Sequence, residues 1–154
     1  MSSYNDPDDF RKTVLGSYVA SKLATLSGAA VEQLFTVTGG EVLLTALWGV
    51  CTVEMAGANT INIQLDPTTG DTVVVATATD LGTTNTAAGT TIGFNAVTLV
   101  PATTIVKGGQ ALRNLVVPTG ESESDVTGAG ADGAIQWYCT YIPLTVGARV
   151  TASA

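Results

Sequence analysis

The sequence predicts a mainly β chain, an antiparallel β-sandwich or jelly roll of about eight strands with an N-terminal helical arm. Three observations lead to this prediction. Charged residues make up only 12% of the 154 residues, and Thr, Val, Ala and Gly fill much of the rest. Thr and Val suit pleated surfaces because their branched side chains pack well there. Apolar and polar residues alternate with a period of two, and Gly- or Pro-containing turns separate the runs.

The first segment has a different period. An Asp-Pro pair at 6–7 is a helix start, because Asp caps the first turn and Pro fits the first helical position. Phe10, Val14 and Tyr18 then recur at helical spacing. The sequence therefore predicts a helix over about 7–26, with its ends uncertain by a few residues. This helix either packs on its own sheet or docks on a neighbouring subunit.

Residues 34–50 form the centre of the pattern, with two apolar strands around Gly39 and Gly40, which suit a turn with positive φ. The second strand, 41–55, is apolar on both faces, and a bulge is expected at Gly49. One predicted face carries Val42, Leu44, Ala46, Trp48 and Val50, and the other carries Leu43, Leu47, Cys51 and Val53. A strand that is apolar on both sides is expected to be covered twice, by the core and by either a helix or a partner.

The remaining strands are shorter. The full set predicted is 31–37, 41–55, 60–65, 73–77 with a continuation at 79–81, 91–100, 103–106, 110–117 and 134–144. In the third, Ile61, Ile63 and Leu65 are expected to face inward, and an Asp-Pro-Thr-Thr-Gly turn follows. In the last, Ile135, Trp137, Cys139 and Tyr141 share one face.

Two loops and two ends complete the predicted organisation. Residues 83–90 lack an apolar anchor and 119–133 are acidic and Gly-rich, so both are expected to be exposed loops. The domains expected are an acidic tail and helical arm at 1–28, a β-sandwich at 29–146 and an extended C-terminal tail at 147–154.

The residues offer no credible catalytic centre, cofactor site or metal site. The chain has no His, which excludes Ser/His/Asp and Cys/His nucleophile systems within it. Cys51 and Cys139 are expected to be buried free thiols, with a disulfide possible if their strands are adjacent. The acidic run near 121–132 does not match an EF-hand, and a solvated loop explains it better than a cation site.

Charge and hydropathy narrow the partners further. The net charge is −7, and the six basic residues are scattered, so nucleic-acid binding is disfavoured. No window approaches the roughly 18 unbroken apolar residues of a membrane span. Few charges and much apolar surface together indicate that protein partners cover part of the exterior.

Three motifs spread along the chain resemble a group of small virion structural proteins of tailed bacteriophages. They are a Leu-Phe-Thr-Val-Thr-Gly-Gly opening at 34–40 with its long apolar strand, a strand ending in Asp-Pro-Thr-Thr-Gly at 59–70, and a Trp-x-x-x-Tyr-x-Pro-Leu strand at 137–144. Together they cover roughly half of the chain. The group usually starts close to its first strand, so the role of the preceding segment 7–26 is not implied by the resemblance.

The resemblance implies a β-domain on the phage particle, either a capsid decoration or cement protein or the base of a head fibre. The expected partners are the major capsid protein or other virion proteins. The chain itself is expected to form a homo-oligomer, for which a trimer is preferred. The expected location is the capsid surface of a virion assembled in the host cytoplasm, with the helical arm or the C-terminal tail as the capsid contact. The alternative is a β-sandwich module that binds a host-surface glycan or receptor from a head fibre or tail.

The residues expected at the interface come from the arm and from the central strand. They are Phe10, Val14, Tyr18, Leu43, Leu47 and Trp48.

Overall fold

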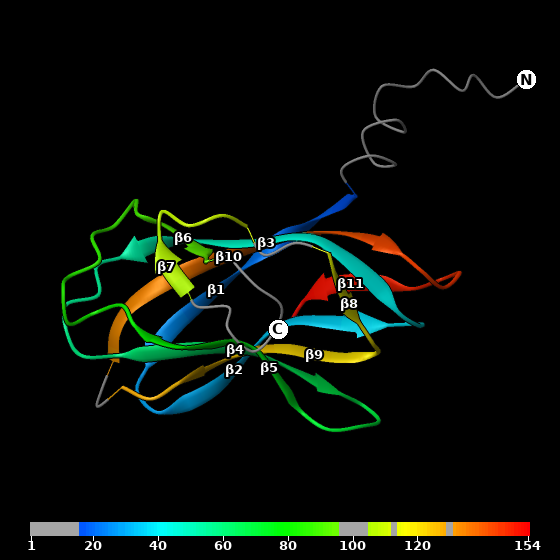
Figure 1. The fold of residues 1–154 in the computed structure, drawn as a ribbon, viewed down its shortest axis with the longest axis horizontal. Coiled ribbons are helices and arrows are strands. Elements are labelled where there is room, and N and C mark those ends of the chain that lie inside the picture. Colours follow the sequence, from blue (N-terminus) through cyan, green and yellow to red (C-terminus); the bar gives the residue numbers. More distant parts are fainter. Residues whose placement is uncertain (1–15, 96–104, 112–113, 129–130) are drawn as a thin grey trace, which may run out of the picture.

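The computed structural model describes residues 16–95, 105–111, 114–128 and 131–154. Two antiparallel sheets lie one over the other and bury a single apolar core between them (Figure 1). The six-stranded sheet runs in the order β1 (Ser17–Ser27), β10 (Ala131–Pro143), β3 (Val42–Val53), β6 (Thr91–Phe94) and β7 (Ile105–Lys107), and β8 (Leu115–Val117) also pairs with β3. The five-stranded sheet runs in the order β11 (Arg149–Ala152), β2 (Ala30–Thr38), β9 (Gly120–Val126), β4 (Thr60–Pro67) and β5 (Val73–Asp80).

The prediction of a mainly β chain with antiparallel sheets is confirmed, but the described residues hold eleven strands rather than about eight. Several predicted strands agree closely. Ile61, Ile63 and Leu65 on β4 are buried as expected. On β10, Trp137 and Cys139 are also fully buried, in line with their predicted shared face. Clear alternation between turn signals was sufficient to orient these strands.

The core is built around Trp137, which lies on β10 against Phe94 on β6 with ring centroids 6.4 Å apart. Gly49 on the neighbouring strand makes room for the indole. A Cβ at Gly49 would lie 2.7 Å from Ile135 Cγ2 and 3.2 Å from Trp137 Cε3. Gly49 is therefore a packing position rather than the bulge that the sequence predicts.

The bulges of β3 lie elsewhere. Its register with β10 shifts between the pairs Ala46–Thr140 and Leu44–Tyr141, which leaves Thr45 as the extra residue, and again beside Thr52. Each extra residue reverses which face the following side chains occupy. The inward residues of β3 are consequently Val42, Leu44, Leu47, Gly49 and Cys51, and the predicted division of its two faces is wrong.

The turn between β2 and β3 has the predicted form. Gly39 and Gly40 have φ values of 78° and 131°, which L side chains rarely adopt. A Cβ on Gly40 would lie 2.5 Å from the Cβ of Thr145, so the turn is also pressed against the β10–β11 connection. Glycine is required here for both reasons.

The predicted helix over 7–26 is wrong from Ser17 onward, and 7–15 lie outside the described residues. Residues 17–27 form β1, which pairs with β10 along its length. Ala24 and Leu26 are buried while Leu23 and Thr25 are exposed, a period of two. The same residues also satisfy a helical period. They form a strand rather than a helix because the open edge of β10 supplies hydrogen-bonding partners for the whole segment.

The acidic segment predicted as a loop is the central strand of the five-stranded sheet. β9 pairs with β2 on one side and β4 on the other. Ser122 and Ser124 face the core, whereas Glu121, Glu123 and Asp125 alternate with them and face outward. Gly and acidic residues mark a loop by composition alone, but here the alternation of Glu and Ser fits a strand with one buried face.

The loop at 83–90 is exposed at most of its positions, as predicted, with Thr86 as the exception. Thr86 is buried, and its backbone exchanges hydrogen bonds with Met55, N to O, at 2.8 and 3.0 Å. Lys107 Nζ donates to the carbonyl oxygens of Thr84 and Asn85. The loop is therefore anchored by its backbone without an apolar side chain.

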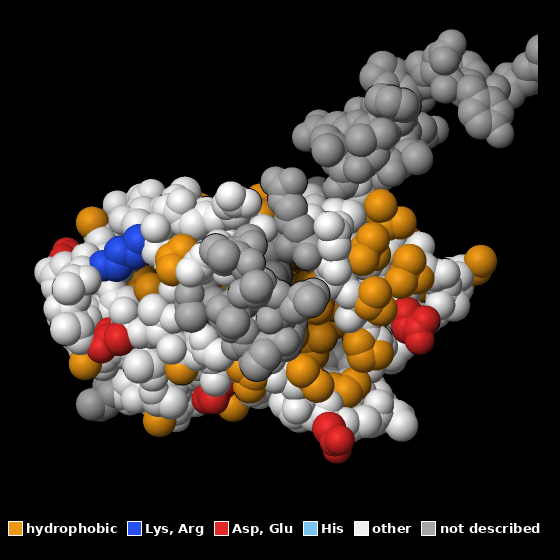
Figure 2. Space-filling model, viewed as in Figure 1, with side chains coloured by type: hydrophobic (Ala, Val, Ile, Leu, Met, Phe, Trp, Pro, Cys, Tyr) orange, Lys and Arg blue, Asp and Glu red, His pale blue; other side chains and the backbone are white. Residues whose placement is uncertain are grey.

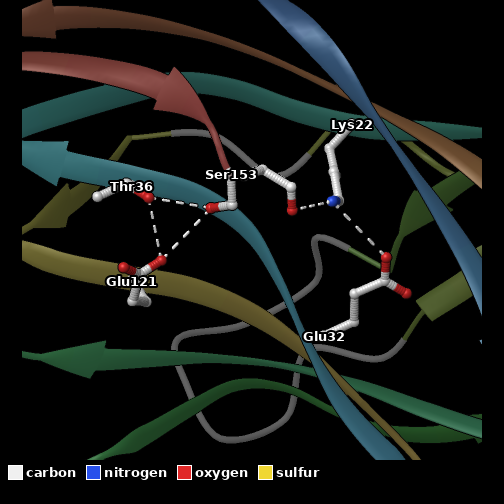
Figure 3. A network of polar contacts seen from close by, with 6 residues as sticks. Lys22, Glu32, Thr36, Glu121 and Ser153 are labelled. Carbon is white, nitrogen blue, oxygen red and sulfur yellow. Dashed lines mark hydrogen bonds and ion pairs between the residues drawn. The ribbon is translucent and has the colours of Figure 1, made fainter.

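The C-terminal segment predicted as a tail contributes β11 and a set of polar contacts (Figure 3). Ser153 Oγ lies 3.0 Å from Thr36 Oγ1, and Lys22 Nζ donates to the Ala154 carbonyl oxygen at 2.7 Å. Lys22 Nζ also lies 4.0 Å from Glu32 Oε1. Burial raises the pKa of Glu32, and the nearby ammonium group of Lys22 partly opposes this. These contacts join the two sheets at one edge of the sandwich.

Candidate interaction surface

The outer face of the six-stranded sheet carries a broad set of apolar side chains, which we call the apolar face. Its residues are Leu23, Leu43, Trp48, Val50, Val116, Tyr138 and Ile142. The strand register shows that they share one side. Ile142, Leu43 and Val116 form one row across β10, β3 and β8, and Leu23 lies in a row with Gln136 and Val50 across β1, β10 and β3.

The bulge at Thr45 produces this face. Leu43 lies before the bulge and Trp48 and Val50 lie after it, and without the extra residue these side chains would point to opposite sides. The hydroxyls of Thr45 and Thr140 are hydrogen-bonded at 2.6 Å across β3 and β10. The bulge is therefore fixed by a side-chain bond at the position where it forms.

At the middle of the face, Trp48 and Tyr138 stack on each other. They are directly opposite on β3 and β10, their ring centroids are 5.5 Å apart and their planes are inclined by 10°. Such an aromatic pair contributes about 0.5–1.5 kcal/mol beyond the area it buries.

Two residues of the apolar face are well exposed, Val116 at 55% and Leu23 at 48%, and the other five are partly buried. Beyond the end of β10, Leu144 and Val146 are 52% and 101% exposed. Figure 2 shows hydrophobic side chains gathered at the end of the molecule where β8 and the end of β10 lie. Adjacent exposed apolar side chains of this size are uncommon on isolated soluble domains and typically mark an interaction site.

Charge separates the two outer faces of the sandwich. The rows from Leu23–Gln136–Val50 to Ile142–Leu43–Val116 contain no charged side chain among their described residues. The outer face of the five-stranded sheet carries Glu121, Glu123 and Asp125 in alternation along β9. There, Gln64 Nε2 donates to Glu123 Oε2 at 2.8 Å and Asn62 Nδ2 donates to Asp125 Oδ2 at 3.0 Å. The described rows of the apolar face are thus uncharged. The other face carries three carboxylates, of which Glu123 is only 7% exposed, together with the exposed Val31.

The residues expected at the interface fall in different places. Leu43 and Trp48 lie on the apolar face. Leu47 is buried in the core of the chain itself, with 1% exposure, because the bulge turns it inward. Tyr18 lies on β1, with its backbone opposite Thr140, and Phe10 and Val14 lie outside the described residues.

The sequence does not predict the other five residues of the face, which are Leu23, Val50, Val116, Tyr138 and Ile142. Two of them had a readable signal. The sequence assigns one face of β10 to the core through alternate residues from Ile135, and the intervening Tyr138 and Ile142 are also large and apolar. A strand with apolar residues on both faces was recognised for β3 but not for β10. Val116 could not be found this way, because β8 is only three residues long.

Carboxylates at the opposite end of the sandwich have structural roles. The carboxylate of Asp132 accepts hydrogen bonds from the backbone N–H groups of Ala56 and Gly57. Asp80 accepts from the Thr83 hydroxyl and from backbone N–H groups including that of Gly82, and these bonds hold the pKa of Asp80 well below its usual range. In the described residues, no group of three His, Cys, Asp or Glu side chains is placed to hold a metal ion.

The two cysteines are free and buried. They lie on adjacent strands but out of register, since Cys51 is opposite Ile135 and Cys139 is opposite Leu47. Burial raises the pKa of the Cys139 thiol to about 12 and also raises that of Cys51. The prediction of buried free thiols is confirmed.

A hollow of about 300 Å³ lies where four connections meet at one end of the sandwich. It is lined by Gly40, Glu41, Thr68, Thr69, Pro118, Thr119 and Thr145. These residues offer hydroxyl groups and one carboxylate but no aromatic ring. The hollow can form hydrogen bonds, but it lacks the flat apolar surface on which a sugar ring would stack.

Comparison with protein-family models, with curated proteins and with solved structures finds no match to this chain. Among the described residues, none belongs to a helix of the length and apolarity needed to cross a lipid bilayer.

Proposed function

We propose that the chain is a non-enzymatic structural protein of the particle of a tailed bacteriophage, a capsid decoration or cement protein that binds the assembled head. The observation that carries the proposal is the apolar face, which is uncharged in its described rows and lies on a sandwich whose other face is acidic. A subunit with this asymmetry has one side suited to packing against neighbouring subunits and one side suited to water. The motif resemblance in the sequence supplies the phage setting.

The mechanism is linkage by binding. A protein that binds the assembled shell but not loose subunits stabilises the assembled state by RT ln(1 + [L]/Kd), which is about 2.7 kcal/mol per site when its concentration is about 100 times Kd. Repeated over many equivalent sites, this becomes a large effect on the shell without any chemical step.

We propose a different contact from the C-terminal one expected from the sequence. The C-terminal segment was one expected capsid contact, but β11 pairs with β2 and Ser153 N donates to Leu34 O at 3.1 Å. These residues are already engaged within the chain. We therefore assign the contact with neighbouring virion subunits to the apolar face.

The test uses particles of the phage from which the chain comes. Mass spectrometry of purified virions should detect the chain at a copy number that matches a symmetric site on the shell, and electron microscopy should place it on the head. Particles assembled without the chain should break at lower temperature or lower denaturant concentration. Absence of the chain from intact virions would refute the proposal.

A second candidate is a binding module for a host-surface glycan, which the hydroxyl-lined hollow beside Glu41 favours. The lack of an aromatic side chain in its lining argues against it. Saturable binding on a glycan array, lost on Glu41→Ala substitution, would support this candidate over the first.

A further inference from the structure

We propose that the apolar face is a self-association surface, on which a second copy of this chain packs face to face about a two-fold axis. The inference rests on the proposed structural role and identifies the neighbouring subunit on the apolar face as a second copy of this chain. It is testable on the purified chain, so its outcome is independent of whether the chain is found in virions.

Charge is the first argument for a second copy. Each chain has a net charge of −7, with 13 acidic and 6 basic residues, so two copies repel each other at most orientations. If the β9 faces met, Glu121, Glu123 and Asp125 of both copies would be brought together, and like charges in contact are costly. The rows of the apolar face bring no described charge to the contact. Face-to-face pairing there also keeps the acidic faces on opposite outer sides.

The arrangement of the face is the second argument. Trp48 and Tyr138 are stacked at its centre, and aliphatic side chains lie on both sides, with Leu23 toward one edge and Val116 toward the other. A two-fold axis near the aromatic pair would place the same patch against itself, as an isologous interface requires. Trp and Tyr side chains near the centre of a contact are typical of the residues that dominate interfaces.

The size of the face sets the expected affinity. Four strands about 4.8 Å apart give a width of roughly 19 Å, and the seven steps from Leu43 to Val50 at about 3.4 Å give a length of roughly 24 Å. Each copy therefore contributes a flat contact area on the order of 450 Å², and two copies together on the order of 900 Å². The added surface of protruding side chains is not counted in these areas. This total lies below the roughly 1,200 Å² of stable specific interfaces and in the range of weak, transient ones, so we expect a reversible dimer with a Kd of about 10⁻⁶ M or above.

The experiment measures mass against concentration by sedimentation velocity and light scattering on the full chain. We expect a concentration-dependent rise from the monomer mass to twice that mass. Because two negatively charged chains repel, association should strengthen with salt, as the screening length falls from about 30 Å at 0.01 M to about 8 Å at 0.15 M. Trp137 is fully buried, so acrylamide quenching reports mainly on Trp48, and quenching should decrease as dimers form.

Two matched substitutions locate the interface. Val116 on the apolar face and Val31 on the acidic face are exposed to similar extents, 55% and 53%. Val116→Glu should raise Kd by at least about tenfold, since it buries an unpaired charge in the contact. Val31→Glu adds the same charge on the opposite side of the sandwich, beside Asp125, and should leave Kd within about twofold. Thermal melts of both variants establish that they are folded.

Three outcomes would overturn the inference. They are a monomer at every concentration, an equal effect of the two substitutions, and a trimer, because face-to-face pairing closes at two copies. Leu23→Glu, at the other edge of the face, is the second variant if Val116→Glu fails to fold, and it should also dissociate the dimer.

Discussion

Removing the hydroxyl of Ser122 should make the chain more stable. Ser122 lies on the inner side of β9, in register with Phe35 on β2 and Leu65 on β4, and it is only 2% exposed. Its Oγ has no hydrogen-bond partner. In the unfolded chain this hydroxyl bonds to water, so folding loses that bond and gains none in return.

The magnitude follows from two opposing terms. Burying an unpartnered hydroxyl costs about 1–3 kcal/mol by mutational measures. Ser122→Ala removes this cost and leaves a void of roughly 15 Å³, which at about 24 cal/mol per Å³ costs about 0.4 kcal/mol. The expected net gain is about 1 kcal/mol, a rise in Tm of about 2–4 °C for a chain of this length.

The assay is equilibrium unfolding in urea, followed by tryptophan fluorescence, together with thermal melts. All samples must have the same protein concentration, since self-association would shift the midpoint. Ser153→Ala is the matched control, because the Ser153 hydroxyl bonds to Thr36 at 3.0 Å and its loss should cost about 0.5–1.5 kcal/mol. If Ser122→Ala destabilises the chain as much as this control, the Ser122 hydroxyl has a partner in solution and the reasoning is wrong.

Three further predictions concern backbone strain, thiol chemistry and pH. Gly120→Ala should destabilise the chain by at least about 2–3 kcal/mol, because a Cβ there would lie 2.3 Å from a backbone oxygen of β4. Gly89→Ala is the control: it is also at positive φ but has nothing within 4 Å of its Cβ, so it should cost about 1 kcal/mol. Urea unfolding measures both variants, and equal effects would contradict this prediction. Cys51 and Cys139 should not react with a thiol reagent in the native chain at neutral pH, and both should react in denaturant; rapid native labelling would show that burial does not protect them. Because the pKa of Asp80 is lowered in the fold, its carboxylate stabilises the fold above the unfolded pKa of about 4, and this stabilisation is lost as the pH falls toward the folded pKa. Asp80→Asn should therefore be less stable than the wild type at pH 7, and the difference in stability should shrink in acid. A constant difference from pH 7 to pH 2 would refute this prediction.

Sequence patterns predicted the strands that alternate plainly and the turns with a required conformation. β4 was oriented correctly because every second residue is a large aliphatic, and the Gly39–Gly40 turn because only glycine tolerates its backbone angles. The sequence predicts a helix in place of β1 because residues 17–26 satisfy both periods. Only the presence of β10 beside it, more than 100 residues later in the chain, selects the strand.

The candidate surface was harder to predict for a related reason. Leu43, Leu47 and Trp48 were all expected at an interface, and a single extra residue at Thr45 turns Leu47 into the core while leaving the other two outside. A bulge of this kind is set by the register with a distant strand, and nothing in the local alternation announces it. Whether Leu43 and Trp48 contact a partner stays a prediction.

The pairing of the first described strand with the tenth has a consequence for biosynthesis. Ser17 on β1 pairs with Tyr141, and Lys22 donates to Ala154, 132 residues away. β3, which forms the middle of the same sheet, also waits for β10. Neither layer can close before β10 and β11 have left the ribosome, so the sandwich forms only late in synthesis. Pairing of strands so distant in the chain is slow, on the order of milliseconds to seconds, and until then the nascent chain carries apolar strand edges that a holding chaperone would recognise.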